Sequence, residues 1–212
     1  TLRFTSQTGF QYGETTRRSV DADTPGLVTG IWGRNDDSML TQELRLNYEG
    51  ERWKWVAGVF GSHQVFDGIA LAVAELEGLG LVQLDEDQLR KTSNLAAFGE
   101  ATYEFAPSWF ATLGGRLDYL KERNTELNSF VFYGMDPALT GDTVSFDELN
   151  FVPKVGLSKE FGDSHTVGLS YTQGFRTGGS YVDRVLPGFP VETYDPEYAQ
   201  SYELSYKGSL LD

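Results

Sequence analysis

Apolar and polar residues alternate with a period of two along most of this chain, which is the pattern of a β-strand with one apolar and one polar face. The first such run covers residues 2–13, and runs of the same kind cover residues 40–48, 94–105, 109–119, 151–161, 166–176 and 198–210. Residues 53–66 are also strand-like, but apolar side chains fall at both parities, so their register stays open. The pattern predicts about eight long antiparallel strands.

The connections between these runs alternate strictly between short and long. Three are tight, at residues 49–52, 106–108 and 162–164, and the long ones cover about residues 14–38, 67–92, 124–143 and 177–197. A soluble antiparallel sheet would show the same alternation along its strands. Loops of roughly 20 residues are uncommon in compact soluble domains, whereas outer-membrane barrels combine short periplasmic turns with long extracellular loops. We therefore predict an all-β fold, a segment of an antiparallel transmembrane β-barrel, as one domain over residues 1–212.

Aromatic side chains gather beside the tight connections. The residues concerned are Tyr48, Trp53, Trp55, Phe105, Trp109 and Phe161. Amphipathic rings collect at membrane interfaces, where they form the girdles of a barrel. Each ring alone would suit an ordinary hairpin, but the set at one end of successive hairpins favours the barrel.

Composition excludes several function classes. The 212 residues carry a net charge of −14 and no cysteine. A nucleic-acid partner is not expected, because phosphate binding needs a basic surface. Disulfides, Cys-ligated zinc and thiol nucleophiles are excluded. The longest apolar stretch, Ile69 to Leu84, is interrupted by Glu75, Glu77 and glycines, and a membrane-spanning helix needs about 18 apolar residues.

Candidate chemistry is sparse. The two histidines, His63 and His165, have no metal-ligand spacing around them, and no nucleophile elbow, phosphate loop or dinucleotide motif is present. The acidic runs 36–37 and 85–87 could offer carboxylates to calcium but lack the spacing of an EF-hand, so solvated loops are favoured. We predict no catalytic residues, no metal, no cofactor and no enzymatic activity.

The last third of the chain carries motifs in a familiar order. The run Ser170–Gly179 (SYTQGFRTGG) is followed by Tyr194–Tyr198 (YDPEY) and by Ser201–Gly208 (SYELSYKG). Earlier pieces fit the same order: QELRL at 42–46, WVAGVF at 55–60, AFGE at 97–100, LGGRLDY at 113–119 and FVPKVGLS at 151–158. Together they resemble the barrel strands of TonB-dependent receptors, with Ser205 standing where that family usually has glycine.

The resemblance implies a bacterial outer-membrane receptor that imports a scarce nutrient, most commonly a ferric siderophore, with cobalamin, sugars and other nutrients as alternatives. It implies contact with outer-membrane lipid, ligand capture by the long loops, and energy relayed by the TonB complex through a plug domain. Arg176, Tyr181 and Arg184 are the ligand-contact candidates, since cationic and aromatic groups suit an anionic metal chelate. The plug, the TonB-contacting box and a C-terminal strand ending in an aromatic residue are not among these residues. We therefore expect an excised segment.

Two other classes stay open at the level of sequence. One is a passive porin or an outer-membrane enzyme such as a lipase, which a plug domain upstream would argue against. The other is a soluble all-β binding domain built from long hairpins, which would need no detergent.

Overall fold

The computed structural model describes residues 1–21, 27–77, 80–132, 138–162, 164–182 and 191–209. These residues form ten β-strands: β1 (Leu2–Asp21), β2 (Leu27–Glu49), β3 (Trp53–Leu76), β4 (Gly80–Ala106), β5 (Trp109–Phe132), β6 (Ala138–Phe161), β7 (His165–Arg176), β8 (Gly179–Val182), β9 (Val191–Tyr194) and β10 (Glu197–Gly208). Within these ranges no helix is long and apolar enough to cross a membrane.

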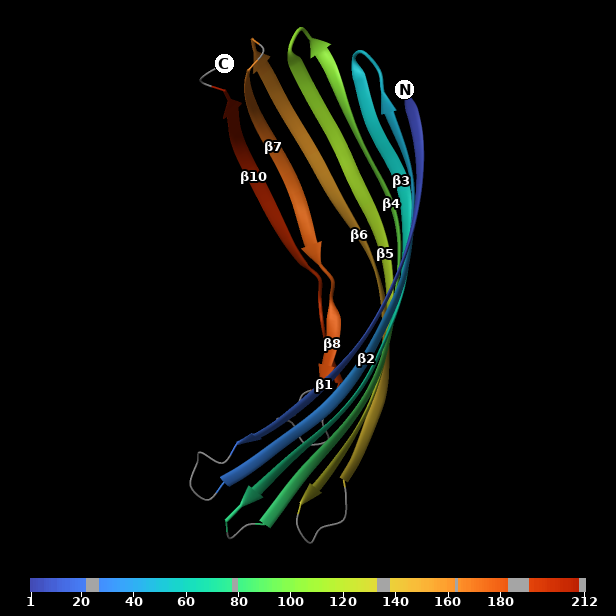
Figure 1. Ribbon diagram of the computed structural model, residues 1–212, viewed down its shortest axis with the longest axis vertical. Helices are drawn as coiled ribbons and strands as arrows, with labels where there is room; N and C mark the ends of the chain where they lie inside the picture. Colours follow the sequence, from blue (N-terminus) through green and yellow to red (C-terminus); the bar gives the residue numbers. More distant parts are fainter. Residues whose placement is uncertain (22–26, 78–79, 133–137, 163, 183–190, 210–212) are drawn as a thin grey trace.

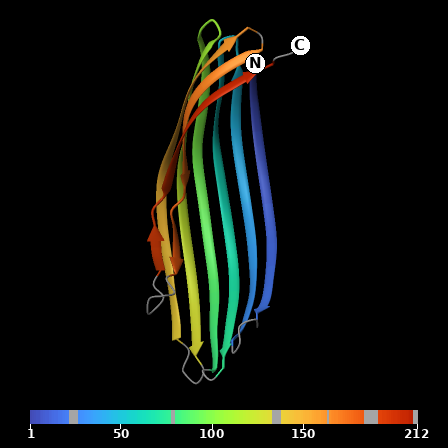
Figure 2. The ribbon, with the colours of Figure 1, turned by 90° about the vertical axis from the view of Figure 1, so that its left-hand side faces the viewer.

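Eight strands form one antiparallel sheet, in the order β1-β2-β3-β4-β5-β6-β7-β10, and β8 and β9 form a separate hairpin. Figure 1 shows the sheet in profile as a curved wall, with β8 of the separate hairpin on its concave side. Figure 2 shows the long strands side by side. In the described part of the chain, β1 pairs with β2 alone and β10 with β7 alone. The sheet is thus an open segment of a barrel wall, which confirms the predicted fold class.

The tight turns keep the strands in register. In the turn between β2 and β3, the Gly50 amide donates to the Trp53 carbonyl at 2.8 Å. Between β4 and β5, Ser108 adopts a positive φ of 62°, and its amide donates to the Glu104 carboxylate at 3.0 Å. A left-handed conformation costs a non-glycine residue roughly 1–2 kcal/mol, which this hydrogen bond helps to offset. Gly162 has φ 59° in the β6–β7 turn, where glycine carries no such cost.

The sheet has an apolar convex face and a polar concave face. Across β4 and β5, large apolar side chains on the convex face stand open, for example Leu95 at 63% and Leu113 at 69% exposure. Among the described apolar residues only Ala96 and Leu120 are buried. Among the described residues, no second layer covers the convex face, so the exposed apolar area is far larger than a soluble monomer usually exposes.

The strands run much further than the alternating pattern indicated. Most of residues 14–38, 67–92 and 124–143 belongs to strands β1–β6, which are 20–27 residues long. Backbone pairing continues without a break through these segments. Between β1 and β2, for instance, it runs from the pair Leu2 and Tyr48 to the pair Asp21 and Thr29. Both faces are mixed or polar there, so the period-two signal fades although the ladder hydrogen bonds persist. The connection 177–197 contains the β8–β9 hairpin instead.

Several aromatic residues beside the tight turns pack in cross-strand pairs. Tyr48 stacks on Trp55 with ring centroids 5.7 Å apart, and Trp53 stacks on Tyr103 at 4.3 Å. Each pair sits on neighbouring strands at directly opposed positions. Such cross-strand pairs contribute roughly 0.2–1 kcal/mol each to the sheet. The register of β3, left open by its sequence, places Trp55 on the convex face.

Candidate functional site

A hydrogen-bonded polar ladder lines the concave face along β4–β6. Its buried members, all at even positions of β5 and β6, are Asp118, Asn124, Glu126, Asn128 and Asn150. Asn124 donates to Glu126 at 2.6 Å, and Gln88 from β4 donates to the same carboxylate at 2.9 Å. Because successive strand residues alternate between faces, the even positions of paired strands bring these groups together.

The β8–β9 hairpin folds against this ladder and accounts for part of its burial. Asn124 donates to the Ser180 hydroxyl at 3.1 Å, and the Gly178 amide donates to Glu148 at 3.2 Å. Gly178 must lack a Cβ, because one would come within 2.6 Å of the Tyr194 carbonyl oxygen. The hairpin therefore lies inside the curve of the wall, in the position Figure 1 shows for β8.

Arg116 on the concave face is held in place by a buried carboxylate and by two aromatic rings. Its guanidinium makes two hydrogen bonds of 2.8 Å to the Asp118 carboxylate, whose side chain is 2% exposed. Asn94 donates to the same carboxylate at 3.2 Å. The guanidinium also lies 5.3 Å from the Phe60 ring centroid and 5.9 Å from that of Phe98. Bidentate pairing and ring contact together fix its orientation.

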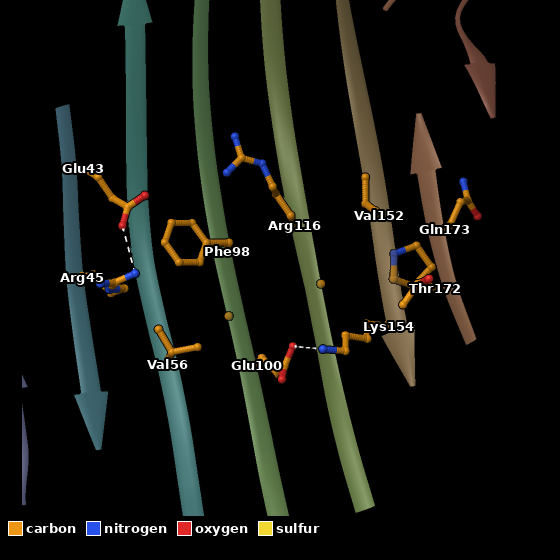
Figure 3. Close-up of a pocket in the computed structure, with 13 residues that line it drawn as sticks. Glu43, Arg45, Val56, Phe98, Glu100, Arg116, Val152, Lys154, Thr172 and Gln173 are labelled. Atoms are coloured by element: carbon orange, nitrogen blue, oxygen red, sulfur yellow. Dashed lines mark hydrogen bonds and ion pairs between the residues drawn. The ribbon is translucent and has the colours of Figure 1, made fainter. Parts of the chain in front are cut away.

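A hollow of about 380 Å³ opens on the concave face beside Arg116, with lining residues drawn from β2 to β7 (Figure 3). Two ion pairs border it: Arg45–Glu43 at 3.5 Å and Lys154–Glu100 at 2.7 Å. The second pair bridges β4 and β6 across Gly114, where a Cβ would lie 3.1 Å from that of Glu100. Charged, aromatic and amide groups thus share one surface that a polar ligand or a polar protein segment could contact.

The structure places two of the three predicted ligand contacts. Arg176 ends β7 and is 75% exposed at its side chain, with a long 4.0 Å contact to Glu197. Tyr181 lies in β8 and is 51% exposed. Since Ser180 faces the wall, alternation turns Tyr181 to the opposite side of the hairpin. Within the described part of the chain, no hydrogen bond or ion pair joins Arg176 to Tyr181, and Arg184 lies outside the described residues.

The two histidines and the acidic residues Asp36 and Asp37 contact neighbouring side chains of the sheet. His63 contacts the Ser93 hydroxyl at 2.9 Å, and His165 contacts the Tyr206 hydroxyl at 2.8 Å beside a tight turn. Asp36 and Asp37 point to opposite faces, the first towards Arg34 and the second towards Gln64. In the described ranges, no three His, Asp or Glu side chains gather as a metal site would require.

A comparison with known protein families identifies the family to which this sheet belongs. The family model of the TonB-dependent receptor-like β-barrel matches residues 1–212, the whole chain. The chain belongs to the TonB-dependent receptor β-barrel family. Members of this family are outer-membrane receptors and transporters, not enzymes, so the predicted family and the predicted lack of enzymatic activity are confirmed.

The solved structure of one receptor supports the fold of this TonB-dependent receptor segment. The ferric yersiniabactin uptake receptor FyuA of Yersinia pestis matches with a TM-score of 0.73 and 15% identity, over 100% of this chain and 31% of that one. BauA, the ferric preacinetobactin receptor of Acinetobacter baumannii, matches with a TM-score of 0.28, 11% identity and 99% and 52% coverage. No curated protein matches the sequence. This chain therefore spans about a third of the length of FyuA.

Sequence reasoning missed the concave cluster around Arg116. The alternation already placed Arg116 and Asp118 on the polar face, but it did not tell which residues of other strands stand beside them. That information lies in the register, which sets Asp118 opposite Ala96 and Asn150. The tight turns were the available signal, since counting outward from them gives the pairing.

Proposed function

We propose that this chain is part of the wall of a bacterial outer-membrane receptor that takes up a ferric siderophore in a TonB-dependent manner. The observation that carries the proposal is the two-faced sheet: an open apolar convex face backs a buried, hydrogen-bonded polar concave face. A closed barrel of such strands meets lipid outside and encloses polar groups inside. The family match then favours a gated receptor over a passive porin or a soluble binding domain.

In this arrangement the tight turns face the periplasm and the far ends of β1–β6 project outside the cell. An apolar band of a barrel is about 25 Å tall, whereas a 24-residue strand is roughly 80 Å long before tilt. The strands therefore extend well beyond the bilayer and present the concave face to ligand. Energy from the TonB complex would reach the wall through a plug domain, which these residues do not include.

A ferric chelate is the first ligand class to test, because FyuA carries such a ligand in its name. In addition, Arg176 at the end of β7 and Tyr181 in the β8–β9 hairpin are both exposed. A guanidinium and an aromatic ring suit an anionic chelate. Arg184 completes the proposed set from its sequence position alone. Cobalamin and sugars are the rival nutrients.

The test is a binding titration of the purified full-length receptor with ferric catecholate and ferric hydroxamate chelates, followed by intrinsic fluorescence quenching. Cyanocobalamin and a maltooligosaccharide serve as ligands of other classes. Tyr181→Ala should weaken chelate binding by roughly 2- to 30-fold, because an aromatic or cation–π contact contributes about 0.5–2 kcal/mol. Tyr202→Ala, an exposed tyrosine on the convex face of β10, should leave it unchanged. Tight binding of cobalamin or sugar alone would reject the ferric chelate.

A further inference from the structure

The convex face carries a group of three cations at the upper limit of its apolar region. Reading the register across β4–β6, the row Leu95–Tyr119–Leu149 is the last with a large apolar side chain on every strand. The next convex row contains Ser93, Lys121 and Asp147, and the row after it contains Lys91, Arg123 and Ser145. Polar groups thus begin abruptly on all three strands, one step beyond Tyr119.

The three cations are close to one another. Lys91 and Arg123 are directly opposed across β4 and β5, which brings their Cα atoms to about 4.5–5.5 Å. Lys121 is two residues from Arg123 on the same strand, roughly 7 Å away. Like charges at opposed positions of a sheet destabilise it. Such a group is therefore unfavourable unless an anion joins it.

Among the described residues, no carboxylate forms an ion pair with these cations. Lys91, Lys121 and Arg123 are all exposed, and none forms an ion pair with any residue in the described part of the chain. Asp147 is opposed to Lys121 but accepts a hydrogen bond of 3.4 Å from the Tyr119 hydroxyl instead. The chain's net charge of −14 makes three such cations on one patch all the more notable as a departure from its average.

Arg34 is a cation on the convex face whose charge is neutralised by carboxylates of the same sheet. It lies on β2, with Asp36 at 3.2 Å and Glu14 at 3.3 Å. The hydrogen bond to Asp36 and the charges of both carboxylates raise the pKa of the Arg34 guanidinium above its ordinary value. Arg34 is internally neutralised, whereas the group on β4 and β5 is not.

We propose that Lys91, Lys121 and Arg123 bind the phosphate groups of outer-leaflet lipid head groups. The inference rests on the proposed membrane orientation, because the apolar rows below the cations must then lie in the hydrocarbon region. The head-group layer begins where the apolar rows end, and this is where the three cations stand. An anionic phosphate complements them in charge, and Tyr119 below them belongs to the aromatic residues typical of that boundary.

The experiment uses the full-length receptor in mixed micelles that contain equal amounts of phosphatidic acid and phosphatidylcholine, with retained lipids counted by native mass spectrometry. We expect the receptor to retain phosphatidic acid preferentially and the preference to weaken as salt rises. Each cation should contribute about fivefold. The triple variant K91Q/K121Q/R123Q should therefore lose the preference, the conservative K91R/K121R should keep it, and Arg34→Gln is the matched control that should also keep it.

Folding of each variant is checked by the heat-dependent shift of the barrel in electrophoresis, and since the three side chains are exposed and unpaired, we expect no change there. An unchanged lipid preference in a folded triple variant would overturn the proposal, as would a wild-type receptor that retains both lipids equally. Removal of the preference by inorganic phosphate, at an ionic strength at which sodium chloride leaves it in place, would overturn the lipid source in favour of a free anion. Retention of neither lipid would contradict the membrane orientation itself, and the proposed function with it.

Discussion

The Arg116–Asp118 pair allows a quantitative test of how the concave face is held together. Both residues lie on β5, two positions apart, and Arg116 makes two hydrogen bonds of 2.8 Å to a carboxylate that is 2% exposed. Hydrogen bonds to charged groups contribute about 1.5–3 kcal/mol each when buried. Arg116 is 37% exposed, so water recovers part of the loss. We expect a coupling of about 2–3 kcal/mol for the pair.

The chain offers a matched control in Arg45–Glu43, on β2. These two residues are also two positions apart on the concave face, but their contact is 3.5 Å and their side chains are 40% and 28% exposed. Solvent-exposed pairs contribute about 0–1 kcal/mol. The structure thus predicts a clear difference between two pairs of the same spacing and chemistry.

The assay is a double-mutant cycle on urea unfolding of the full-length receptor in detergent, with Arg116→Gln, Asp118→Asn and the double variant, and the equivalent set at 45 and 43. A coupling at 116–118 at least about 1 kcal/mol above that at 43–45 is the expected result. Equal couplings, or a larger one at 43–45, would refute the reasoning that burial and bidentate geometry dominate this face.

Two further substitutions test neighbouring features. Gly114→Ala places a Cβ 3.1 Å from that of Glu100, under the Glu100–Lys154 ion pair, and should lower the free energy of unfolding by roughly 1–3 kcal/mol. The control is Gly13→Ala, where a Cβ would meet nothing within 4 Å and the free energy of unfolding should change by less than about 0.5 kcal/mol. Equal effects of the two substitutions in urea unfolding would count against the close approach. Asn124→Ala removes the hydrogen bond to Ser180 and should speed amide hydrogen exchange in β8 and β9 but not in the paired part of β7, and uniform exchange across all three strands would show that the hairpin is held by other contacts.

Much of the fold could be predicted from sequence because the part of each strand next to the tight turns alternates between apolar and polar residues with a period of two. Residues such as Leu113 and Leu117 mark the convex face, and the tight turns mark the strand ends. Beyond Tyr119 the period fades, because both faces of a strand in water can be polar. For this reason the outer halves of β1–β6 looked like loops although their backbone pairing is continuous.

The site was less accessible to sequence reasoning, since it depends on which strands stand side by side. Tyr181 and Arg176 were chosen for their chemistry and their place near a strand end, and the structure leaves both exposed. The contact of Asn124 with Ser180 joins residues 56 positions apart. No local pattern encodes that contact, because it depends on the hairpin folding back into the curve of the wall.

In the proposed orientation, odd positions of β5 face lipid and even positions face the enclosed side, with the change to water at Lys121. The chain contains no cysteine, so single cysteines at positions 111 to 123 can each carry a nitroxide spin label in the reconstituted full-length receptor. We expect oxygen, which concentrates in the bilayer, to relax labels at 113, 115, 117 and 119 more than labels at 114, 116 and 118. We expect this difference to disappear at 121 and 123. Equal relaxation at odd and even positions, or stronger relaxation at the even ones, would contradict the proposed orientation.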